Sequence, residues 1–328
     1  MKKIILVIAG CVLTLSMILF VLFIVGFGQE PANKEMTSPE LHPLMIEALR
    51  SRSFPAQELA VVKNPGDKGL YQSFVVSYFA DGLSVRALLN IPKYNMPPKG
   101  FPVVIVCHGH YDLKKYTTEK TYPAISSYFA EHGFIMLKPD YRGHGESQAS
   151  EDPYLDRVAY PVDVLTLLAA VPTIKEADTE NIFLWGHSMG GTVALTVLEV
   201  RPEIKAASLW GAVSVPFPES LMYFARKHSA QTAEERLRLI CSYIKEKDFS
   251  KISPADHLYK ITAPILIQHG TADELVPYEW SVTLNAKLAA LGKVHEFVTW
   301  QNANHNLSGL QIKALDHDVV FFRKYLKK

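Results

Sequence analysis

The sequence has little cysteine and almost no net charge. Its 328 residues include 3 cysteines, none in a Cys-x-x-Cys pair, so their spacing indicates neither a disulfide framework nor a zinc finger. The 34 lysines and arginines nearly balance the 33 acidic residues, and lysines and arginines form no run longer than a pair, such as the last two lysines. Because nucleic-acid binding leaves a basic footprint, we expect no nucleic-acid partner. The sequence also contains no internal repeat and no low-complexity segment.

Two of the cysteines fall in segments that are expected to fold. Cys107 ends an apolar run, and Cys241 lies in an amphipathic helical pattern. Buried thiols behave as small hydrophobic groups, so we predict both in the core, with a disulfide as the alternative.

A long uncharged apolar stretch is present at residues 4–27, preceded by two lysines. Such a stretch can cross the roughly 30 Å hydrocarbon layer as one helix, and the lysines favour a cytoplasmic amino end. We therefore predict a retained membrane anchor at residues 1–28, with an extracytoplasmic catalytic domain. A cleaved signal peptide is the alternative, and lipid attachment to Cys11, which follows Ile-Ala-Gly, is a minor one.

The remainder is predicted to be an α/β domain. Residues 29–56 read as a linker with a short helix, and residues 57–328 as the catalytic domain. Eight strand-like runs occur at 73–79, 83–91, 102–107, 134–138, 182–185, 206–210, 264–268 and 294–300, with helical patterns at 122–132, 160–171, 189–200, 279–291 and 310–325. A hairpin followed by alternating strands and helices predicts an eight-stranded, mainly parallel sheet with helices on both faces. An insertion at about 212–260 is predicted to form a small helical cap.

The chain is organised around a serine between two glycines. The apolar run at 182–185 ends at Gly186, Ser188 and Gly190, and a helical pattern follows at once. This strand, turn and helix context is that of a nucleophile elbow, which holds a serine hydroxyl out at the end of a strand. The competing interpretation is a glycine-rich helix start capped by serine.

An acid and a base follow in the order expected for such a serine. Asp273 comes after the run at 264–268, and His305 after the run at 294–300. In parallel sheets these positions lie at one edge, where ligands gather. Asp140, which follows another strand, is the alternative acid. His295 lies within a strand, so His305 is the expected base, while His144, His187 and Arg142 are expected to fix loops.

These motifs resemble those of α/β-hydrolases over residues 57–328. The carrying segments are His108-Gly109-His110, Asp140-Tyr141-Arg142-Gly143-His144-Gly145, the elbow, Ser253-Pro254, His269-Gly270-Thr271-Ala272-Asp273 with Val276-Pro277, and Ala303-Asn304-His305. Within that superfamily the sequence is most similar to the prolyl oligopeptidase catalytic domain and to dienelactone-hydrolase-like esterases. It departs from the former in having no stretch for an amino-terminal propeller.

The expected chemistry is acyl transfer without a cofactor or metal. His305 would take the proton of Ser188, and Asp273 would orient the imidazole. The backbone N–H groups of Met189 and His110 would hold the oxyanion. Several aromatic residues are candidates for a substrate pocket under the cap, although at helical spacing they also fit a core: Tyr111, Trp210, Phe217, Tyr223 and Phe224.

Four hypotheses of function follow. A serine esterase leads, and a prolyl oligopeptidase-type peptidase acting on short peptides or acylated amino acids is the near alternative. Metal-dependent hydrolysis is a remote one, because His108, His110 and Asp112 have the spacing of a metallo-β-lactamase-like motif, although Leu113 stands where a further histidine belongs. A non-catalytic binding module is the fourth. The sequence does not indicate an oligomeric state.

Overall fold

The computed structural model describes residues 42–151 and 153–327. The predicted anchor and the alternatives at its place, including Cys11, lie outside the described residues. Within residues 42–327, apart from residue 152, no helix is both long and apolar enough to cross a bilayer.

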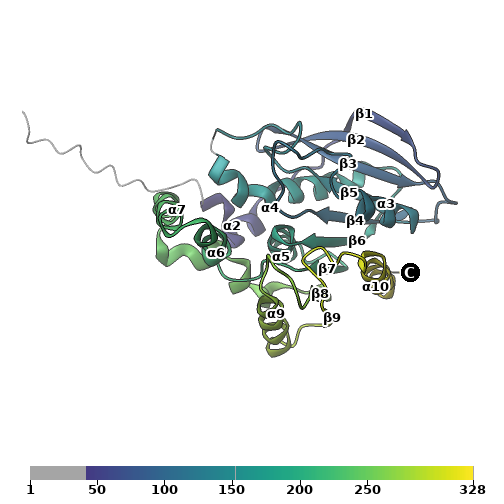
Figure 1. Cartoon of the computed structure of the whole chain (residues 1–328). Coiled ribbons are helices and arrows are strands. Elements are labelled where there is room, and N and C mark those ends of the chain that lie inside the picture. Colours follow the sequence, from purple (N-terminus) through teal and green to yellow (C-terminus); the bar gives the residue numbers. More distant parts are fainter. Residues whose placement is uncertain (1–41, 152, 328) are drawn as a thin grey trace, which may run out of the picture. The chain divides into compact units, whose positions relative to one another are not determined.

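The described chain forms one sheet of nine strands (Figure 1). Its order is β1-β2-β3-β5-β4-β6-β7-β8-β9, which runs from the top to the bottom of Figure 1. The strands are β1 (Ala60–Asp67), β2 (Tyr71–Ala80), β3 (Leu83–Pro92), β4 (Phe101–Cys107), β5 (Ile135–Pro139), β6 (Ala177–His187), β7 (Ala206–Trp210), β8 (Ile265–Gly270) and β9 (His295–Trp300).

The predicted count of eight strands is wrong, because β1 was missed. β1 is an edge strand whose register against β2 shifts twice, and it contains Pro65 and Gly66. Its apolar residues Val61 and Val62 are 59% and 44% exposed, so the strand shows no alternation of buried and exposed side chains. Proline and bulges are typical of sheet edges, where they also deter pairing with another chain.

The remaining strands follow the predicted pattern. β2 and β3 pair as an antiparallel hairpin through Asp81 and Gly82, both of which have positive φ, as a tight hairpin turn requires. From β5 and β4 through β9 the neighbouring strands are parallel. β5 and β7 are buried at every residue, as expected for parallel strands covered on both faces.

Helices cover both faces of the sheet, which gives two hydrophobic cores. The larger core contains residues of α2 (Ile46–Ser51), α4 (Pro153–Ala170), α5 (Met189–Val200) and α9 (Tyr278–Ala290). The smaller contains residues of α3 (Pro123–Glu131) and α10 (Gln311–Lys324). Short helical segments complete the fold: η1 (His42–Leu44), η2 (Val171–Thr173), η3 (Glu246–Asp248), α8 (Phe249–Ile252), η4 (Pro254–Asp256) and η5 (Leu258–Lys260).

Two helices near the amino end of the described chain refine the sequence prediction. The predicted short helix is η1 with α2, and its Ile46 and Leu49 are buried, while Arg50 donates to the carbonyl oxygen of Glu199 at the end of α5. α4 begins seven positions before the predicted start at residue 160 and continues through Pro161. Residues 42–52 therefore belong to the same packed unit as the catalytic helices.

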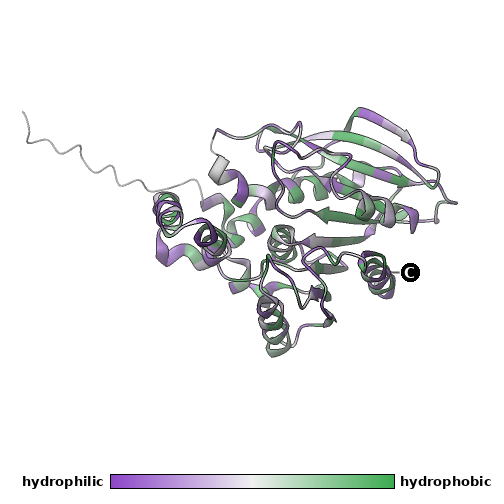
Figure 2. Cartoon of the chain, viewed as in Figure 1, coloured by the Kyte–Doolittle hydropathy of each residue, from purple (hydrophilic) through white to green (hydrophobic). Residues whose placement is uncertain are grey.

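The segment predicted to form a cap contains two helices of similar length. Between β7 and β8 the chain forms α6 (Glu219–His228) and α7 (Ala230–Tyr243), which contact each other. Their inner faces bury Met222, Ala225, Ala233 and Ile240, and Figure 2 shows hydrophilic residues elsewhere along both helices. An amphipathic pair of this kind covers one face of the body and leaves its other face in water.

The two cysteine predictions have different outcomes. Cys107 is buried at the end of β4, as predicted, whereas Cys241 is exposed on α7, so the prediction of a buried thiol there is wrong. Both thiols are free.

Candidate active site

Ser188 lies at the sharp turn from β6 into α5. Its φ of 57° and ψ of −121° are unfavourable for a side chain with a Cβ, and such strain costs on the order of 1–3 kcal/mol. Backbone hydrogen bonds hold it there, because the N–H of Ser188 donates to the carbonyl of Trp210 at 2.9 Å. Its own carbonyl accepts from Gly191 at 2.9 Å and Val213 at 3.0 Å. The strain is compensated by the surrounding structure.

The flanking glycines are required by close backbone approach. A Cβ on Gly190 would lie 2.0 Å from the carbonyl oxygen of Cys107, and one on Gly186 would lie 2.7 Å from the carbonyl oxygen of Gly190. Both distances are shorter than a van der Waals contact, and the atoms approached belong to the backbone, so a side chain at either position would clash. The Gly-x-Ser-x-Gly pattern is thus set by the packing of α5 against β4 and β6, and the nucleophile-elbow geometry is present.

His305 and Asp273 form a hydrogen-bonded pair. Nδ1 of His305 lies 2.7 Å from Oδ2 of Asp273, and both side chains are almost fully buried. The second oxygen, Oδ1, accepts the backbone N–H groups of Leu275 at 2.9 Å and Val276 at 2.8 Å. With its carboxylate fixed on both sides, Asp273 can hold the imidazole in one orientation and leave Nε2 of His305 without a proton.

His269, the second-last residue of β8, makes a further contact with the same carboxylate. Its Nε2 lies 2.9 Å from Oδ2 of Asp273, and its Nδ1 accepts from the Ser281 hydroxyl at 2.7 Å. Burial raises the pKa of the Asp273 carboxyl, but the hydrogen bonds from His269 and His305 outweigh it and hold that pKa well below its usual range. Asp273 is therefore ionised at neutral pH. No role for His269 beyond its place in the shared motif is predictable from the sequence.

Gly211, just after β7, makes room for this pair. A Cβ there would lie 3.1 Å from Oδ2 of Asp273 and 3.3 Å from Nδ1 of His305, and the residue has a φ of +47°. Gly211 lies in none of the motifs that the sequence contains. Its only signal was its position directly after a buried strand.

Ser188 and His305 line one cavity of about 510 Å³ at the carboxyl ends of the parallel strands. Met189, His110 and Tyr111 line it as well. The serine comes from β6, the histidine from the loop after β9, and Asp273 stands behind His305 from the loop after β8. The fold thus brings the three predicted side chains to one edge of the sheet.

Asp140, the alternative acid, is engaged elsewhere. Tyr116 donates to its Oδ1 at 2.8 Å, Thr118 donates to its Oδ2, and Nζ of Lys138 lies 3.9 Å away. Burial raises the pKa of Asp140 to about 6, an effect that Lys138 partly opposes. Because its oxygens are used within this closed cluster, Asp140 does not orient His305.

The residues of the two predicted oxyanion donors, Met189 and His110, both line the cavity at Ser188. Met189 is the first residue of α5, where a backbone N–H has no partner within the helix. His110 belongs to the loop that follows β4. The neighbouring N–H of Gly109 is already engaged, because it donates to the Tyr122 hydroxyl at 3.0 Å.

Tyr122 and His187 link the loops around the serine. The Tyr122 hydroxyl lies 2.5 Å from Nδ1 of His187, and Nε2 of His187 lies 3.1 Å from the carbonyl oxygen of His305. A carbonyl only accepts, so Nε2 carries the proton and Nδ1 accepts from Tyr122. Burial, together with a smaller effect of the nearby His305 ring, lowers the pKa of His187 to about 3, so the His187 ring is neutral. The predicted loop-fixing role of His187 is consistent with these contacts.

Arg142 also fixes its own loop, as predicted. Its Nη2 lies 2.6 Å from Oδ1 of Asp163 and 3.1 Å from Oδ2 of Asp81. The guanidinium therefore ties the loop after β5 to α4 and to the β2–β3 turn, away from the cavity.

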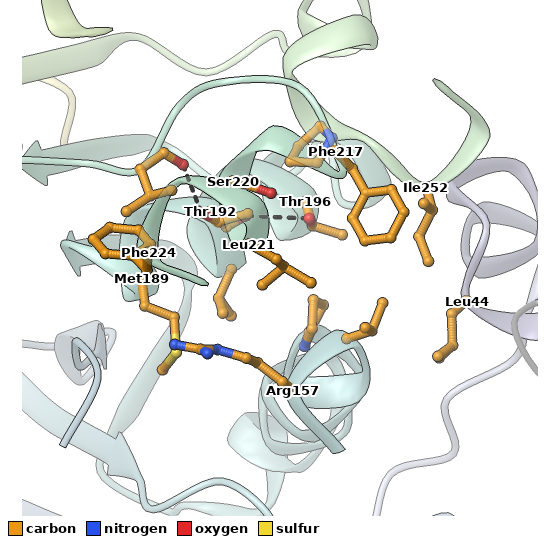
Figure 3. Close-up of a pocket in the computed structure, with 15 residues that line it drawn as sticks. Leu44, Arg157, Met189, Thr192, Thr196, Phe217, Ser220, Leu221, Phe224 and Ile252 are labelled. Atoms are coloured by element: carbon orange, nitrogen blue, oxygen red, sulfur yellow. Dashed lines mark hydrogen bonds between the residues drawn. The ribbon is translucent and has the colours of Figure 1, made fainter. Parts of the chain in front are cut away.

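The aromatic candidates divide between cavity and core. Tyr111 lines the cavity at Ser188, and Phe217 lines a second, apolar cavity of about 80 Å³ under α6 (Figure 3). Phe224 lines both. Trp210 instead is buried and donates to Asp318 at 3.3 Å, and Tyr223 packs on Trp280 with ring centroids 4.8 Å apart.

The residues of the metal-site hypothesis do not converge. His108 is buried, with its ring nitrogens 2.8 Å and 3.1 Å from the backbone carbonyl oxygens of Gly109 and Asp140. His110 lies instead at the cavity wall. Throughout the described part of the chain, no three His, Cys, Asp or Glu side chains gather as metal ligands do.

Comparison with known proteins gives one family match. The profile of the prolyl oligopeptidase family matches residues 120–328, which is more than half of the chain and includes Ser188, Asp273 and His305. The match begins after β4 and extends through α10.

Curated relatives carry both peptidase and esterase names. The uncharacterized peptidase YtmA of Bacillus subtilis is 26% identical over 69% of this chain and 82% of its own length. Esterase YjfP of Escherichia coli is 25% identical over 74% of this chain and 98% of its own.

Solved structures share the fold. A puromycin-hydrolyzing peptidase of Mycobacterium tuberculosis superposes with a TM-score of 0.63 at 20% identity, covering 79% of this chain and 40% of that one. An acetyl xylan esterase of Paenibacillus sp. R4 superposes with a TM-score of 0.62 at 19% identity, covering 86% and 92%. At these identities the likeness concerns the fold, which is that of α/β-hydrolases.

Proposed function

The chain belongs to the prolyl oligopeptidase family of serine hydrolases, and from this premise we propose that it cleaves carboxylic esters through an acyl-enzyme formed on Ser188. The observation that carries the proposal is that His305 lines the same cavity as Ser188, while its Nδ1 lies 2.7 Å from Oδ2 of the buried Asp273 carboxylate behind it. A serine at its free pKa is a poor nucleophile without a positioned base.

The first half of the reaction forms the acyl-enzyme. Asp273 accepts the Nδ1 proton of His305, so the Nε2 lone pair takes the hydroxyl proton as the oxygen of Ser188 attacks the ester carbonyl. The N–H groups of Met189 and His110 would stabilise the oxyanion, and removing one such donor typically costs about 2.7 to 4 kcal/mol. His305 then gives its proton to the departing alcohol.

The second half repeats these steps with water. His305 takes a proton from a water molecule, the resulting hydroxide attacks the acyl carbon, and the carboxylic acid leaves as Ser188 is reprotonated. Asp273 stabilises the imidazolium in both halves.

Ester substrates are favoured over peptides by one relative in particular. Esterase YjfP corresponds to this chain over 98% of its own length, so the likeness includes almost the whole of that enzyme. Peptidase action on short peptides is the second candidate, supported by the family match and by YtmA.

The test is a panel of aryl esters and aminoacyl amides offered to the full chain, with Ser188→Ala as the control. We expect aryl esters to be turned over at least tenfold more efficiently than amides, and Ser188→Ala to abolish both activities. Faster cleavage of amides would favour the peptidase, and turnover that survives in Ser188→Ala would overturn the mechanism.

We also propose that residues 1–28 anchor this domain to a membrane, because residues 4–27 are uncharged and apolar over a bilayer-spanning length. The full chain should then stay with membranes after alkaline carbonate washing. Release by that wash would argue against an anchor.

A further inference from the structure

The cavity at Ser188 is lined by basic side chains without an acidic one. Arg157, Arg236, His110 and His228 line it, and no Asp or Glu is among its lining residues. The basic groups come from different parts of the fold, since Arg157 belongs to α4, His110 follows β4, and the other two belong to the cap helices α7 and α6. A substrate that enters this cavity meets positive charge from the body and from the cap.

Arg157 stands at the junction of the two cavities. It lines both the 510 Å³ cavity at Ser188 and the apolar 80 Å³ cavity beneath α6, as Met189 does. Figure 3 shows the Arg157 side chain reaching from its helix with the guanidinium beside the end of the Met189 side chain. Met189 directly follows the serine in the chain, and Arg157, Met189 and Ser188 all line the larger cavity.

Arg157 and Arg236 have no acidic partner among the residues that the structure describes. Within the described chain no carboxylate forms an ion pair with Arg157 or Arg236. Burial lowers the pKa of Arg157, Tyr160 partly opposes that effect, and the charge of Arg236 makes a smaller contribution in the lowering direction. Two guanidinium groups thus repel each other in a partly enclosed site, which is an unfavourable arrangement until an anion lies between them.

Three other acidic residues close in sequence to cavity-lining residues have partners of their own. Asp112 lies 3.8 Å from Lys115, and Asp156, in the first turn of α4, accepts the backbone N–H of Ser150 at 3.3 Å. Glu274 accepts the backbone N–H of His305 at 3.2 Å. None of the three lines the cavity, so the missing negative charge is not supplied from these neighbours.

We propose that the substrate carries a carboxylate, which binds between Arg157 of the body and Arg236 of the cap while its scissile carbonyl lies at Ser188. This inference rests on the proposed function and narrows its substrate class to anionic esters. Guanidinium groups bind carboxylates through paired, charge-assisted hydrogen bonds, which are stronger than hydrogen bonds between neutral groups. The bound anion would also tie α7 to α4 and so hold the cap over the site.

The test compares matched esters that differ in one charge. For a carboxylate on the acyl side, the pair is mono-4-nitrophenyl adipate and its methyl ester. For a carboxylate on the leaving group, the pair is 3-carboxy-4-nitrophenyl butyrate and its methyl ester. We expect one pair to show at least a tenfold higher kcat/KM for the anionic member, and which pair does so locates the anion.

Three variants assign the preference to the arginines. Arg157→Gln and Arg236→Gln should each reduce the ratio of anionic to neutral kcat/KM at least tenfold, mainly through KM, whereas Arg157→Lys should retain part of it. Arg238→Gln is the matched control for Arg236→Gln. Arg238 lies on the same helix, α7, but its side chain is exposed and pairs with Glu234 at 3.4 Å. Its ratio should equal that of the wild type. If Arg157→Gln fails to fold, Arg236→Gln, on the exposed cap, still decides.

The outcomes separate this inference from the proposed function. Ester turnover that depends on Ser188 but shows no anionic preference, or a preference unchanged in both glutamine variants, would overturn the carboxylate site and leave the hydrolase intact. Ester turnover that persists in Ser188→Ala would overturn the proposed function itself.

Discussion

The hydroxyl of Tyr122 lies 2.5 Å from Nδ1 of His187, and this contact joins three loops around the nucleophile. Tyr122 accepts the N–H of Gly109 in the oxyanion loop, and His187 holds the backbone of His305 through its other nitrogen. The direction of each hydrogen bond in this series is fixed, because only the His187 tautomer with its proton on Nε2 satisfies both contacts of the ring. The relationship suggests that the loops are positioned as one unit.

Removing that hydroxyl should weaken catalysis more than binding. Tyr122→Phe leaves the Gly109 N–H and the His187 Nδ1 without partners, a loss of about 1–3 kcal/mol for each buried polar group. We expect kcat to fall about tenfold to a hundredfold with KM within a factor of three, measured by steady-state ester hydrolysis. Tyr128→Phe is the control, because that hydroxyl bonds Asp316. Equal losses in the two variants would contradict a positioning role.

Asp273→Asn should leave the fold intact and remove most activity. The amide has nearly the same shape, but it cannot stabilise the His305 imidazolium and favours the wrong tautomer. A comparable change in a serine protease lowers kcat by about 10⁴. Glu274→Gln, next to the same histidine backbone, should change kcat by less than tenfold. A small effect of Asp273→Asn would mean that another group orients His305.

The same carboxyl should contribute to acid stability with a definite sign. Its pKa in the folded state is depressed, so it stabilises the fold above the unfolded value of about 3.9. That contribution is lost as the pH falls below about 4 toward the folded pKa. The difference in unfolding free energy between wild type and Asp273→Asn should therefore shrink between pH 5.5 and pH 3, as measured by urea denaturation. A constant difference would show that the carboxyl titrates alike in both states.

Gly211→Ala should damage the site out of proportion to its effect on the fold. The new methyl group would meet the carboxylate of Asp273 and the ring of His305 at 3.1 and 3.3 Å. Gly292→Ala is the matched control, because Gly292 also has positive φ but no atom within 4 Å of an added Cβ. Both variants should lose about 1 kcal/mol from backbone strain. Only Gly211→Ala should lose activity, by at least tenfold in kcat, and similar activities would refute the steric argument.

Ser188, Asp273 and His305 could be predicted because each is marked by residues that are its neighbours in the sequence. The elbow joins a buried strand to an apolar helix with glycines at fixed offsets, and Asp273 and His305 each follow a strand in the expected order. Parallel strands end at the same edge of a sheet, so position in the chain implied position in space.

The parts that were missed depend on tertiary neighbours. Gly211 matters only because Asp273 and His305 approach it, and Tyr122 only because Gly109 and His187 do. Nothing in the sequence near these residues indicates those partners.

Three predictions about helices and strands were wrong where local sequence preferences differ from what the folded chain does. β1 was missed because its valines face solvent and Pro65 interrupts it. α4 was started too late because Pro161 lies within it, which also kept Arg157 out of the predicted helix. Cys241 was placed in the core because an amphipathic helix pattern does not identify its inner face at every position.

The most direct test of the central claim is the site and rate of fluorophosphonate labelling, read by mass spectrometry of the digested full chain. We predict a single adduct on Ser188, formed at least a hundredfold more slowly in His305→Ala because the hydroxyl then lacks its base. An adduct on another residue, or an equal rate in His305→Ala, would contradict the account.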